Sequence, residues 1–269
     1  MTSSQPAATV LQRWALGVEY RGSAYCGWQR QAEQPSVQEA LETALSAIAT
    51  QRINVIAAGR TDTGVHASLQ VVHFETSATR EASAWARGGN QFLPGDISIR
   101  WAMPVDAEFH SRFSARSRRY VYLLASQPHR PGLHSRRVGW THWPIEMSRV
   151  EAALPALWGT HDFTSFRAAE CQAKSPIKTM HSATVSAHGN LLRFDFHADA
   201  FLHHMIRNIM GALVYIGNGR QPADWLKTLI AQKDRKLAAP TFSPDGLYLA
   251  GIEYDRRFNI PEIFVDPWL

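Results

Sequence analysis

The hydrophobic pattern of this chain switches between a period of two residues and a period of about 3.6 residues in a fixed order, and that order limits the folds open to it. Residues 14–20 alternate as in a half-buried strand, and Ser36 with Glu39 forms a capping box before a helical pattern over residues 37–48. Further patterns predict strands at 53–57 and 70–75, a helix at 81–91 and a strand at 97–103. The resulting β-α-β-β-α-β order is the ferredoxin-like arrangement.

The second half of the chain repeats this order. Residues 119–125 alternate as a strand, and a helical pattern that begins with a capping box at Ser148 is expected to bend at Pro155. The remaining patterns are a hairpin with strands at 179–187 and 191–198, helices at 202–216 and from 222 onwards, and a strand at 247–254.

Two such units in succession predict an α+β protein made of two ferredoxin-like subdomains. We expect their strands to form an extended, mainly antiparallel sheet, with a central basic cleft between the halves. The predicted division is an N-terminal subdomain over residues 10–115, a C-terminal subdomain over 116–256 and a tail over 257–269. The two halves share little visible residue identity, so the repeat is inferred from the order of elements alone.

Composition argues against a membrane-spanning, an exported or a disulfide-stabilised protein. Of the 269 residues, 45% are hydrophobic and 19% are charged, and no apolar run approaches the ~18 residues of a membrane span. Residues 1–8 have neither a basic start nor an apolar block, which predicts a cytoplasmic protein without an export signal. The two cysteines, Cys26 and Cys171, form no disulfide framework.

Positive charge is concentrated in one stretch. Residues 112–137 contain seven arginines and no acidic residue, although the net charge of the whole chain is only +5. A solvated basic face is the usual explanation for such a run, but the absence of any balancing acid over this length favours a polyanionic partner such as a phosphate backbone.

A short glycine-flanked loop presents a single acidic side chain. Residues 58–67 read Ala-Gly-Arg-Thr-Asp-Thr-Gly-Val-His-Ala, so Asp62 stands between Gly59 and Gly64, with Arg60 two residues before it. An arginine that faced Asp62 would keep the carboxylate ionised, ready to act as a nucleophile or base. The residue types alone favour an ordinary Asx-turn between two strands.

Twelve histidines suggest a metal site, but their spacing does not support one. His203 and His204 are adjacent within the predicted helix at 202–216, where neighbouring side chains point about 100 degrees apart. No His-Glu-x-x-His or Cys-x-x-Cys pattern is present, and neither is a glycine-rich nucleotide loop. We therefore expect no metal and no cofactor, with the chemistry carried by side chains.

Several stretches, taken together and in order, resemble the motifs of the TruA family of tRNA pseudouridine synthases. The first is the string at residues 59–67, which is similar to the family's catalytic signature. The others lie at residues 20–31, 109–113, 115–122, 161–171, 201–208 and 246–249. The resemblance runs over nearly the whole chain and implies the pseudouridine synthase fold.

The resemblance also assigns roles to residues. It implies that Asp62 is the catalytic nucleophile, that Arg207 is its partner, and that Tyr120 and Leu247 pack against the target base. It implies RNA contacts by Arg60, which would help to flip the base, and by Arg80, Phe109, His110, Ser111, Arg112, Phe113, Glu170, Cys171, Gln172, Ala173 and Lys174. Residues 170–174 depart from the family's pattern, because the corresponding segment of relatives is often more basic.

The implied reaction converts uridine to pseudouridine at positions 38, 39 and 40 of the tRNA anticodon stem-loop, by base flipping and without a cofactor. The family further implies a homodimer. Two other classes stay open: a tRNA-binding protein without catalysis, which would use the same basic run, and a metal-dependent hydrolase built on the histidines, which EDTA would inactivate.

Overall fold

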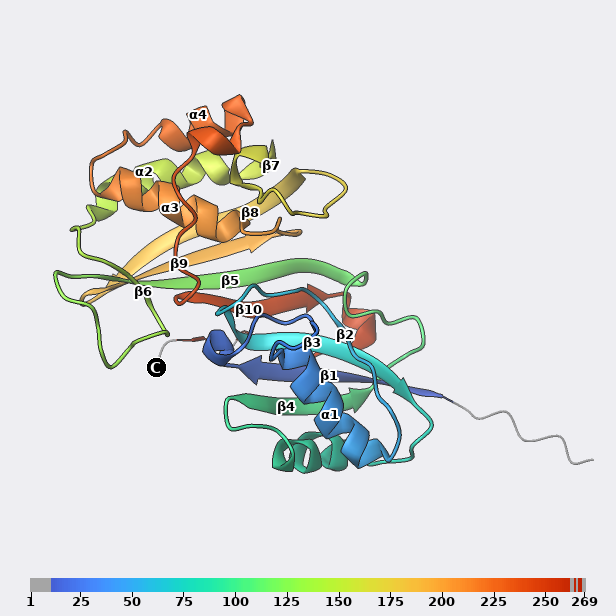
Figure 1. The fold of residues 1–269 in the computed structure, drawn as a ribbon. Helices are drawn as coiled ribbons and strands as arrows, with labels where there is room; N and C mark the ends of the chain where they lie inside the picture. The colour runs from blue at the N-terminus through green and yellow to red at the C-terminus, as the bar shows by residue number, and fades with distance from the viewer. Residues whose placement is uncertain (1–10, 262–263, 265, 268–269) are drawn as a thin grey trace, which may run out of the picture.

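The protein is built on one large mixed sheet covered by helices (Figure 1). The computed structural model describes residues 11–261, 264, 266 and 267; residues 1–8, where no leader was predicted, lie outside them. The strands follow the order β4-β1-β3-β10-β5-β9-β8-β7, with β2 paired to β3 and β6 to β5. Their bounds are β1 Gln12–Tyr20, β2 Ile56–Ala57, β3 His66–Thr76, β4 Ile97–Pro104, β5 Ala115–Ser126, β6 Gly139–Thr141, β7 Gly159–Asp162, β8 Ile177–His188, β9 Leu191–Ala198 and β10 Leu247–Tyr254.

Most strand pairs are antiparallel, as predicted. The parallel pairs are β3 with β10 and β5 with β6. The strand β10 lies between β3 and β5, so it joins the strands of the first half to those of the second. The α+β class and the extended, mainly antiparallel sheet are therefore confirmed.

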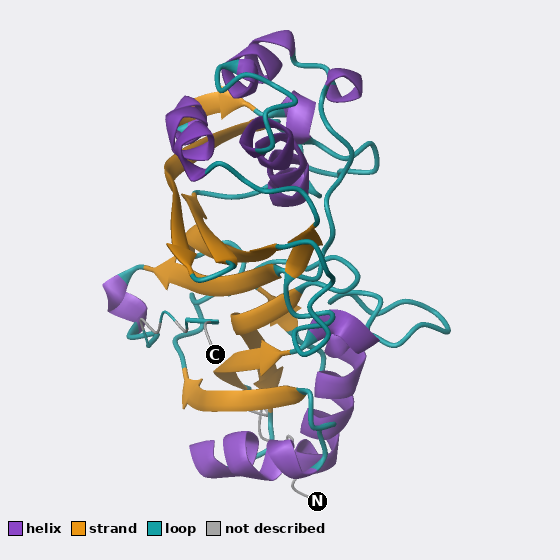
Figure 2. Cartoon of the chain, turned by 90° about the vertical axis from the view of Figure 1, so that its left-hand side faces the viewer, coloured by secondary structure: helices purple, strands orange, loops and turns teal. Residues whose placement is uncertain are grey.

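Helices pack at the two ends of this sheet (Figures 1 and 2). Helix α1 (Val37–Ala49) accompanies the strands of the first half, while α2 (Met147–Ala153), α3 (Met205–Gly217) and α4 (Trp225–Gln232) gather over the second. Within the described residues, no helix has the length and apolarity that crossing a bilayer requires.

Local signals fixed several elements correctly. The Glu39 backbone N–H donates to Ser36 Oγ at 3.3 Å, which is the predicted cap of α1. The two-residue turn at Gly189 and Asn190 joins β8 and β9, with His188 paired to Leu191. Along β5, Tyr120, Tyr122 and Leu124 belong to the main core, whereas the alternate residues join a smaller core on the other face.

Three predicted helices differ from the structure. The first, at 81–91, is a π-helix over Ala84–Gly88 followed by a 3-10 turn over Gly89–Gln91. The predicted cap at Ser148 is wrong: α2 begins at Met147, and Ser148 donates to the Glu146 carboxylate from inside the helix. As expected for an internal proline, α2 stops before Pro155 and continues as a 3-10 turn.

The third difference affects the site. The predicted helix at 202–216 begins only at Met205, because His204 adopts a left-handed backbone conformation with φ of 61°. A residue in that conformation cannot continue a right-handed helix. His203 and His204 therefore lie in a turn before α3, and the argument that helical geometry separates them is wrong.

Candidate active site

The Asp62 loop connects β2 to β3 and is held mostly by hydrogen bonds between uncharged groups, with one donated by Arg118 to the Ala58 carbonyl at 3.1 Å. The Tyr20 hydroxyl lies 2.8 Å from Thr61 Oγ1, and Gln70 Nε2 donates to the Gly59 carbonyl at 2.7 Å. The backbone N–H of Trp28 donates to the Thr61 carbonyl at 3.0 Å. The loop is thus fixed by β1, by β3 and by the segment at residues 20–31.

A glycine permits one of these contacts. Gly27 has φ of 92°, and a Cβ placed on it would lie 2.7 Å from the Thr61 carbonyl oxygen. Only a residue without a side chain fits this approach. The segment at residues 20–31, recognised in the sequence as a second motif, therefore packs directly on the loop that carries Asp62.

A buried histidine ties the end of this loop to two other segments. The Gly22 backbone N–H donates to His66 Nδ1 at 3.0 Å, so the ring proton resides on Nε2 and is donated to the Asp245 carbonyl at 3.0 Å. Burial lowers the pKa of His66 to about 4, which keeps the ring neutral at physiological pH. Sequence reasoning assigned no role to this residue, although it stands inside the catalytic signature.

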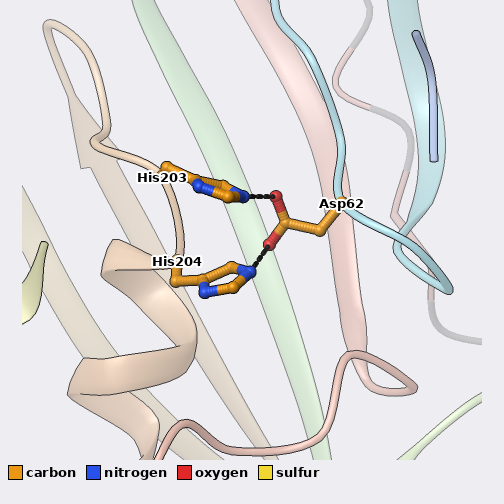
Figure 3. Close-up of side chains that lie close together, drawn as sticks. All are labelled: Asp62, His203 and His204. Atoms are coloured by element: carbon orange, nitrogen blue, oxygen red, sulfur yellow. Dashed lines mark ion pairs between the residues drawn. The ribbon is translucent and has the colours of Figure 1, made fainter. Parts of the chain in front are cut away.

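Three side chains from the turn before α3 and from its first helical turn meet the Asp62 carboxylate. Figure 3 shows the two histidines among them. Arg207 Nη1 donates to Oδ2 at 3.2 Å, as the resemblance implied. His203 Nε2 lies 3.3 Å from Oδ1, and His204 Nε2 lies 3.4 Å from Oδ2. Arg207 is itself positioned by donation from Nε to the Phe242 carbonyl at 2.9 Å.

These contacts control the ionisation of the site. Burial raises the pKa of Asp62, but hydrogen bonding to His203 and the charges of His204, His203 and Arg207 outweigh it, so the pKa lies below its ordinary value. The hydrogen bond to Asp62 raises the pKa of His203, whereas burial lowers that of His204. Asp62 is therefore ionised at neutral pH and, with a 19% exposed side chain, still reachable.

The arginine that pairs with Asp62 differs from one that the loop sequence suggested. Arg60 is exposed, and the described structure gives it no ion pair with Asp62. The guanidinium at the carboxylate is that of Arg207, from α3. The sequence spacing put Arg60 near Asp62, but the backbone of the loop directs it outwards.

Asp62, His203 and His204 could also hold a metal ion, since their ligand atoms lie within 4.8 Å of one another. Arg207 already places a positive charge 3.2 Å from one carboxylate oxygen. A cation at this point would meet like-charge repulsion from the guanidinium. The arrangement is better matched to an ionised carboxylate held by protein cations.

Tyr120 and Leu247 lie on neighbouring strands on the same side of the sheet. The register pairs Tyr122 with Leu247 and Tyr120 with Leu249, so Leu247 is diagonal to Tyr120. Tyr120 is 9% exposed and packs edge-on against Phe201, with ring centroids 5.0 Å apart. Burial, followed by the Asp62 charge, raises the pKa of Tyr120.

Two of the predicted RNA contacts are interior residues. Phe109 is 0% exposed and packs against Tyr254 and Phe258, and Ser111, also 0% exposed, donates to the Ile56 carbonyl at 2.7 Å. Their side chains support the segment from inside, so the expectation that they touch RNA is wrong. Their neighbours at 110, 112 and 113 form its outer side, and Phe113 is 77% exposed.

The segment 170–174 lies against the turn that carries the histidines. Cys171 Sγ accepts from the His203 backbone N–H at 3.4 Å, and Arg167 donates to the carbonyls of Cys171 and Ala173 at 2.6 and 2.9 Å. Glu170, Gln172 and Lys174 are exposed. Arg80, at another place on the surface, donates to the carbonyls of residues 48 and 79.

Comparisons with known proteins cover most of the chain. A family model described as tRNA pseudouridine synthase matches residues 17–114 and 153–255. The tRNA pseudouridine synthase A of Dechloromonas aromatica is 55% identical over 250 residues, which are 93% of this chain and 95% of that protein. The proteins of the same name from Nitrosomonas eutropha and Pseudomonas aeruginosa are 54% and 50% identical, covering 91% and 98% of this chain and 89% and 93% of their own.

Proposed function

Because the chain belongs to the family of tRNA pseudouridine synthases, we propose that Asp62 is the residue that starts conversion of uridine to pseudouridine at positions 38, 39 and 40 of the tRNA anticodon stem-loop. The observation that carries this proposal is the pairing of Asp62 with Arg207, 3.2 Å apart, at the end of the matched loop. An ionised, partly exposed carboxylate beside a buried tyrosine is what the reaction requires.

The reaction breaks the bond between uracil N1 and ribose C1′ and forms a bond between C5 and C1′. The proton on C5 is lost and N1 gains one, so the nucleotide keeps its composition and no electron donor or acceptor is consumed. Asp62 can begin this exchange by attacking C1′, by attacking C6 of the base, or by removing a ribose proton. Each route needs the carboxylate form, which the surrounding cations favour.

The target nucleotide has to leave its stack before Asp62 can reach it. We assign Arg60, exposed on the same loop, to the space that the flipped nucleotide vacates. Tyr120 and Leu247 would contact the base, and their burial would keep water from an intermediate. We assign outer RNA contacts to Arg80, His110, Arg112 and Phe113, together with residues 170–174.

The resemblance supports a broader description of the molecule. We infer two ferredoxin-like halves, residues 10–115 and 116–256, flanking a basic cleft in the pseudouridine synthase fold. We also propose that the enzyme is a cytoplasmic homodimer and that one tRNA spans both subunits. In the tail, Asp266 pairs with Arg193 and Phe258 packs against Phe109, so these residues pack against the core of the protein.

The test is incubation of unmodified tRNA transcripts with the protein in EDTA, followed by mapping of pseudouridine. We expect product at positions 38 to 40. Binding without product would identify a tRNA-binding protein, and loss of activity in EDTA with release of free base would identify a metal-dependent hydrolase.

Asp62→Ala and Asp62→Asn should abolish product while tRNA binding is largely kept. Asp224→Asn is the matched control, since Asp224 precedes α4 and its side chain makes no cap hydrogen bond. Substantial product from either Asp62 variant would remove this carboxylate from the mechanism.

A further inference from the structure

A loop between β5 and β6 carries arginines that the structure leaves without acidic partners. Residues 127–138, called the basic loop below, contain Arg130, Arg136 and Arg137. No acidic residue occurs between Glu108 and Glu146. The basic loop also lies between the two segments that the family model matches.

Apart from Arg112, the arginines of the same acid-free stretch fall into two groups of three. On β5, Arg116 pairs with Asp255 and Arg119 with Glu253, while Arg118 donates to four backbone carbonyls. Within the part of the chain that the structure describes, the three arginines of the basic loop form no ion pair. The concentration of positive charge seen in the sequence is therefore uncompensated in the basic loop, whereas much of it is neutralised on β5.

The basic loop is exposed but anchored. Residues 132–136 are consecutively exposed, and so is Arg130. The Tyr248 hydroxyl donates to the Arg137 carbonyl at 2.6 Å, and Arg136 Nη1 donates to the Ser23 carbonyl at 3.3 Å. These contacts hold the loop by its backbone and one guanidinium. Arg130 is exposed, and Arg137, half-buried beside Tyr248, has no carboxylate partner among the described residues.

The anchors place the basic loop beside the Asp62 loop. Ser23 follows Gly22, whose N–H binds the His66 ring, and that ring stacks on Tyr248 with centroids 4.6 Å apart. His66 is four residues beyond Asp62, and the Val65 N–H donates to the Asp62 carbonyl at 3.1 Å. A nucleic acid strand that delivered a nucleotide to Asp62 would pass next to this loop.

We propose that the basic loop binds the phosphate backbone of the RNA substrate, next to the nucleotide held at Asp62. This inference rests on the proposed function for the identity of the RNA. Free guanidinium groups are suited to phosphate oxygens, and they contribute to affinity by releasing condensed counterions. Such contacts position the RNA without reading its sequence.

A second copy of the chain is the alternative partner for the basic loop. Leu133, at the tip of the basic loop, is 94% exposed, and an apolar tip could enter a protein surface. Charge complementarity favours RNA, because the exposed residues around Leu133 are basic or uncharged. Near the anchored end, burial raises the pKa of Tyr248, the charge of Arg137 lowers it and that of Asp245 raises it.

The test compares two double variants that each remove two positive charges. Arg130→Gln with Arg137→Gln alters the basic loop and leaves untouched Arg136, whose guanidinium anchors the loop to the Ser23 carbonyl. Arg220→Gln with Lys227→Gln is the matched control on and near α4, at the far end of the second half. Binding of an unmodified tRNA transcript is measured over a salt series. The mass of the assembled protein in solution is measured by sedimentation.

We expect the loop variant to lower the slope of log affinity against log salt by roughly 1.4 to 1.8, the value for two lost phosphate contacts, and the control to lower it by less than half as much. Equal slopes in the two variants would overturn the proposal. A change in the mass of the assembled protein, without a change in the salt slope, would also overturn the proposal. It would assign the loop to an interface between copies of the chain. Absence of pseudouridine with the wild-type protein would count against the proposed reaction, and the binding series would still decide the role of the loop.

Discussion

The two sides of the Asp62 site are built from different interactions. On the loop side, mostly neutral groups hold the backbone in place: the Tyr20 hydroxyl, the Gln70 amide and the uncharged His66 ring, with Arg118 the one charged donor described. On the α3 side, Arg207 and the histidine pair contact the carboxylate itself. The comparison indicates that the position of Asp62 is set mainly by one half of the chain and its charge by the other.

Removing the charge from the α3 side should have the largest effect. Arg207→Ala leaves Asp62 partly buried without its permanent cation, and we expect turnover to fall by about 100-fold or more. Single-turnover measurement of pseudouridine formation gives the value. Arg60→Ala is the comparison within the loop and should weaken nucleotide flipping more than folding. Unaltered turnover in the Arg60→Ala variant would show that Arg60 is an ordinary surface residue with no role in flipping.

Distorting the loop side should have the next largest effect, and on stability as well as turnover. Gly27→Ala forces a side chain against the Thr61 carbonyl at a positive φ, and we expect a loss of about 2 kcal/mol in the free energy of unfolding. Urea denaturation measures this loss. Gly59→Ala is the control, since nothing lies within 4 Å of a Cβ at that position. Equal stability of the two variants would show that the close approach at Gly27 is unimportant.

Removing one neutral contact from the loop side should cost less. Tyr20→Phe deletes the hydroxyl that meets Thr61 Oγ1, with an expected loss of roughly 1 kcal/mol. Tyr215→Phe serves as the control, because the described structure gives the Tyr215 hydroxyl no hydrogen bond. If both phenylalanine variants unfold at the same urea concentration, the Tyr20 contact does not hold the loop.

The smallest predicted effect concerns pH and the α3 side. His203 has a raised pKa in the folded protein, so its contact with Asp62 contributes fully below the ordinary value near 6.5 and is lost as pH rises through the folded value. The Asp62 pKa is lowered, so the carboxylate contributes above about pH 4 and loses that contribution only in stronger acid. Between these limits the pair should add less than about 1 kcal/mol, since His203 is 39% exposed.

The measurement is the difference in unfolding free energy between the wild type and His203→Gln from pH 5.5 to 8.5. We expect this difference to shrink as pH rises. His204, whose pKa is lowered by burial, should behave in the opposite way and cost stability as it becomes charged in acid. A pH-independent difference would show that His203 acts only by its shape.

Local patterns in the sequence predicted most of the fold but not the turn before α3. Period-two alternation identified β5, and the Ser36 cap identified α1, because both signals are read within a few residues. The helix at 202–216 was extended too far because the residues before Met205 continue its apolar pattern, and the left-handed backbone of His204 leaves no such trace. That error separated the two histidines which the structure brings to Asp62.

The site residues were likewise predicted only in part. The pairing of Arg207 with Asp62 followed from the resemblance, and the structure has it at 3.2 Å. The resemblance assigned residues 109–113 to RNA as one block, and a motif does not show which of its side chains, here Phe109 and Ser111, face inwards. The predicted roles of Tyr120, Leu247 and the outer RNA contacts stay predictions.

The place of β10 has a consequence for the order in which the molecule can be assembled during synthesis. It is the last of the described strands in the chain, yet it lies between β3 and β5 and supplies Leu247. While a ribosome is still translating residues 247–254, the nascent polypeptide has no central strand to unite its early and late portions. The growing chain therefore cannot complete its sheet until residues 247–254 have emerged.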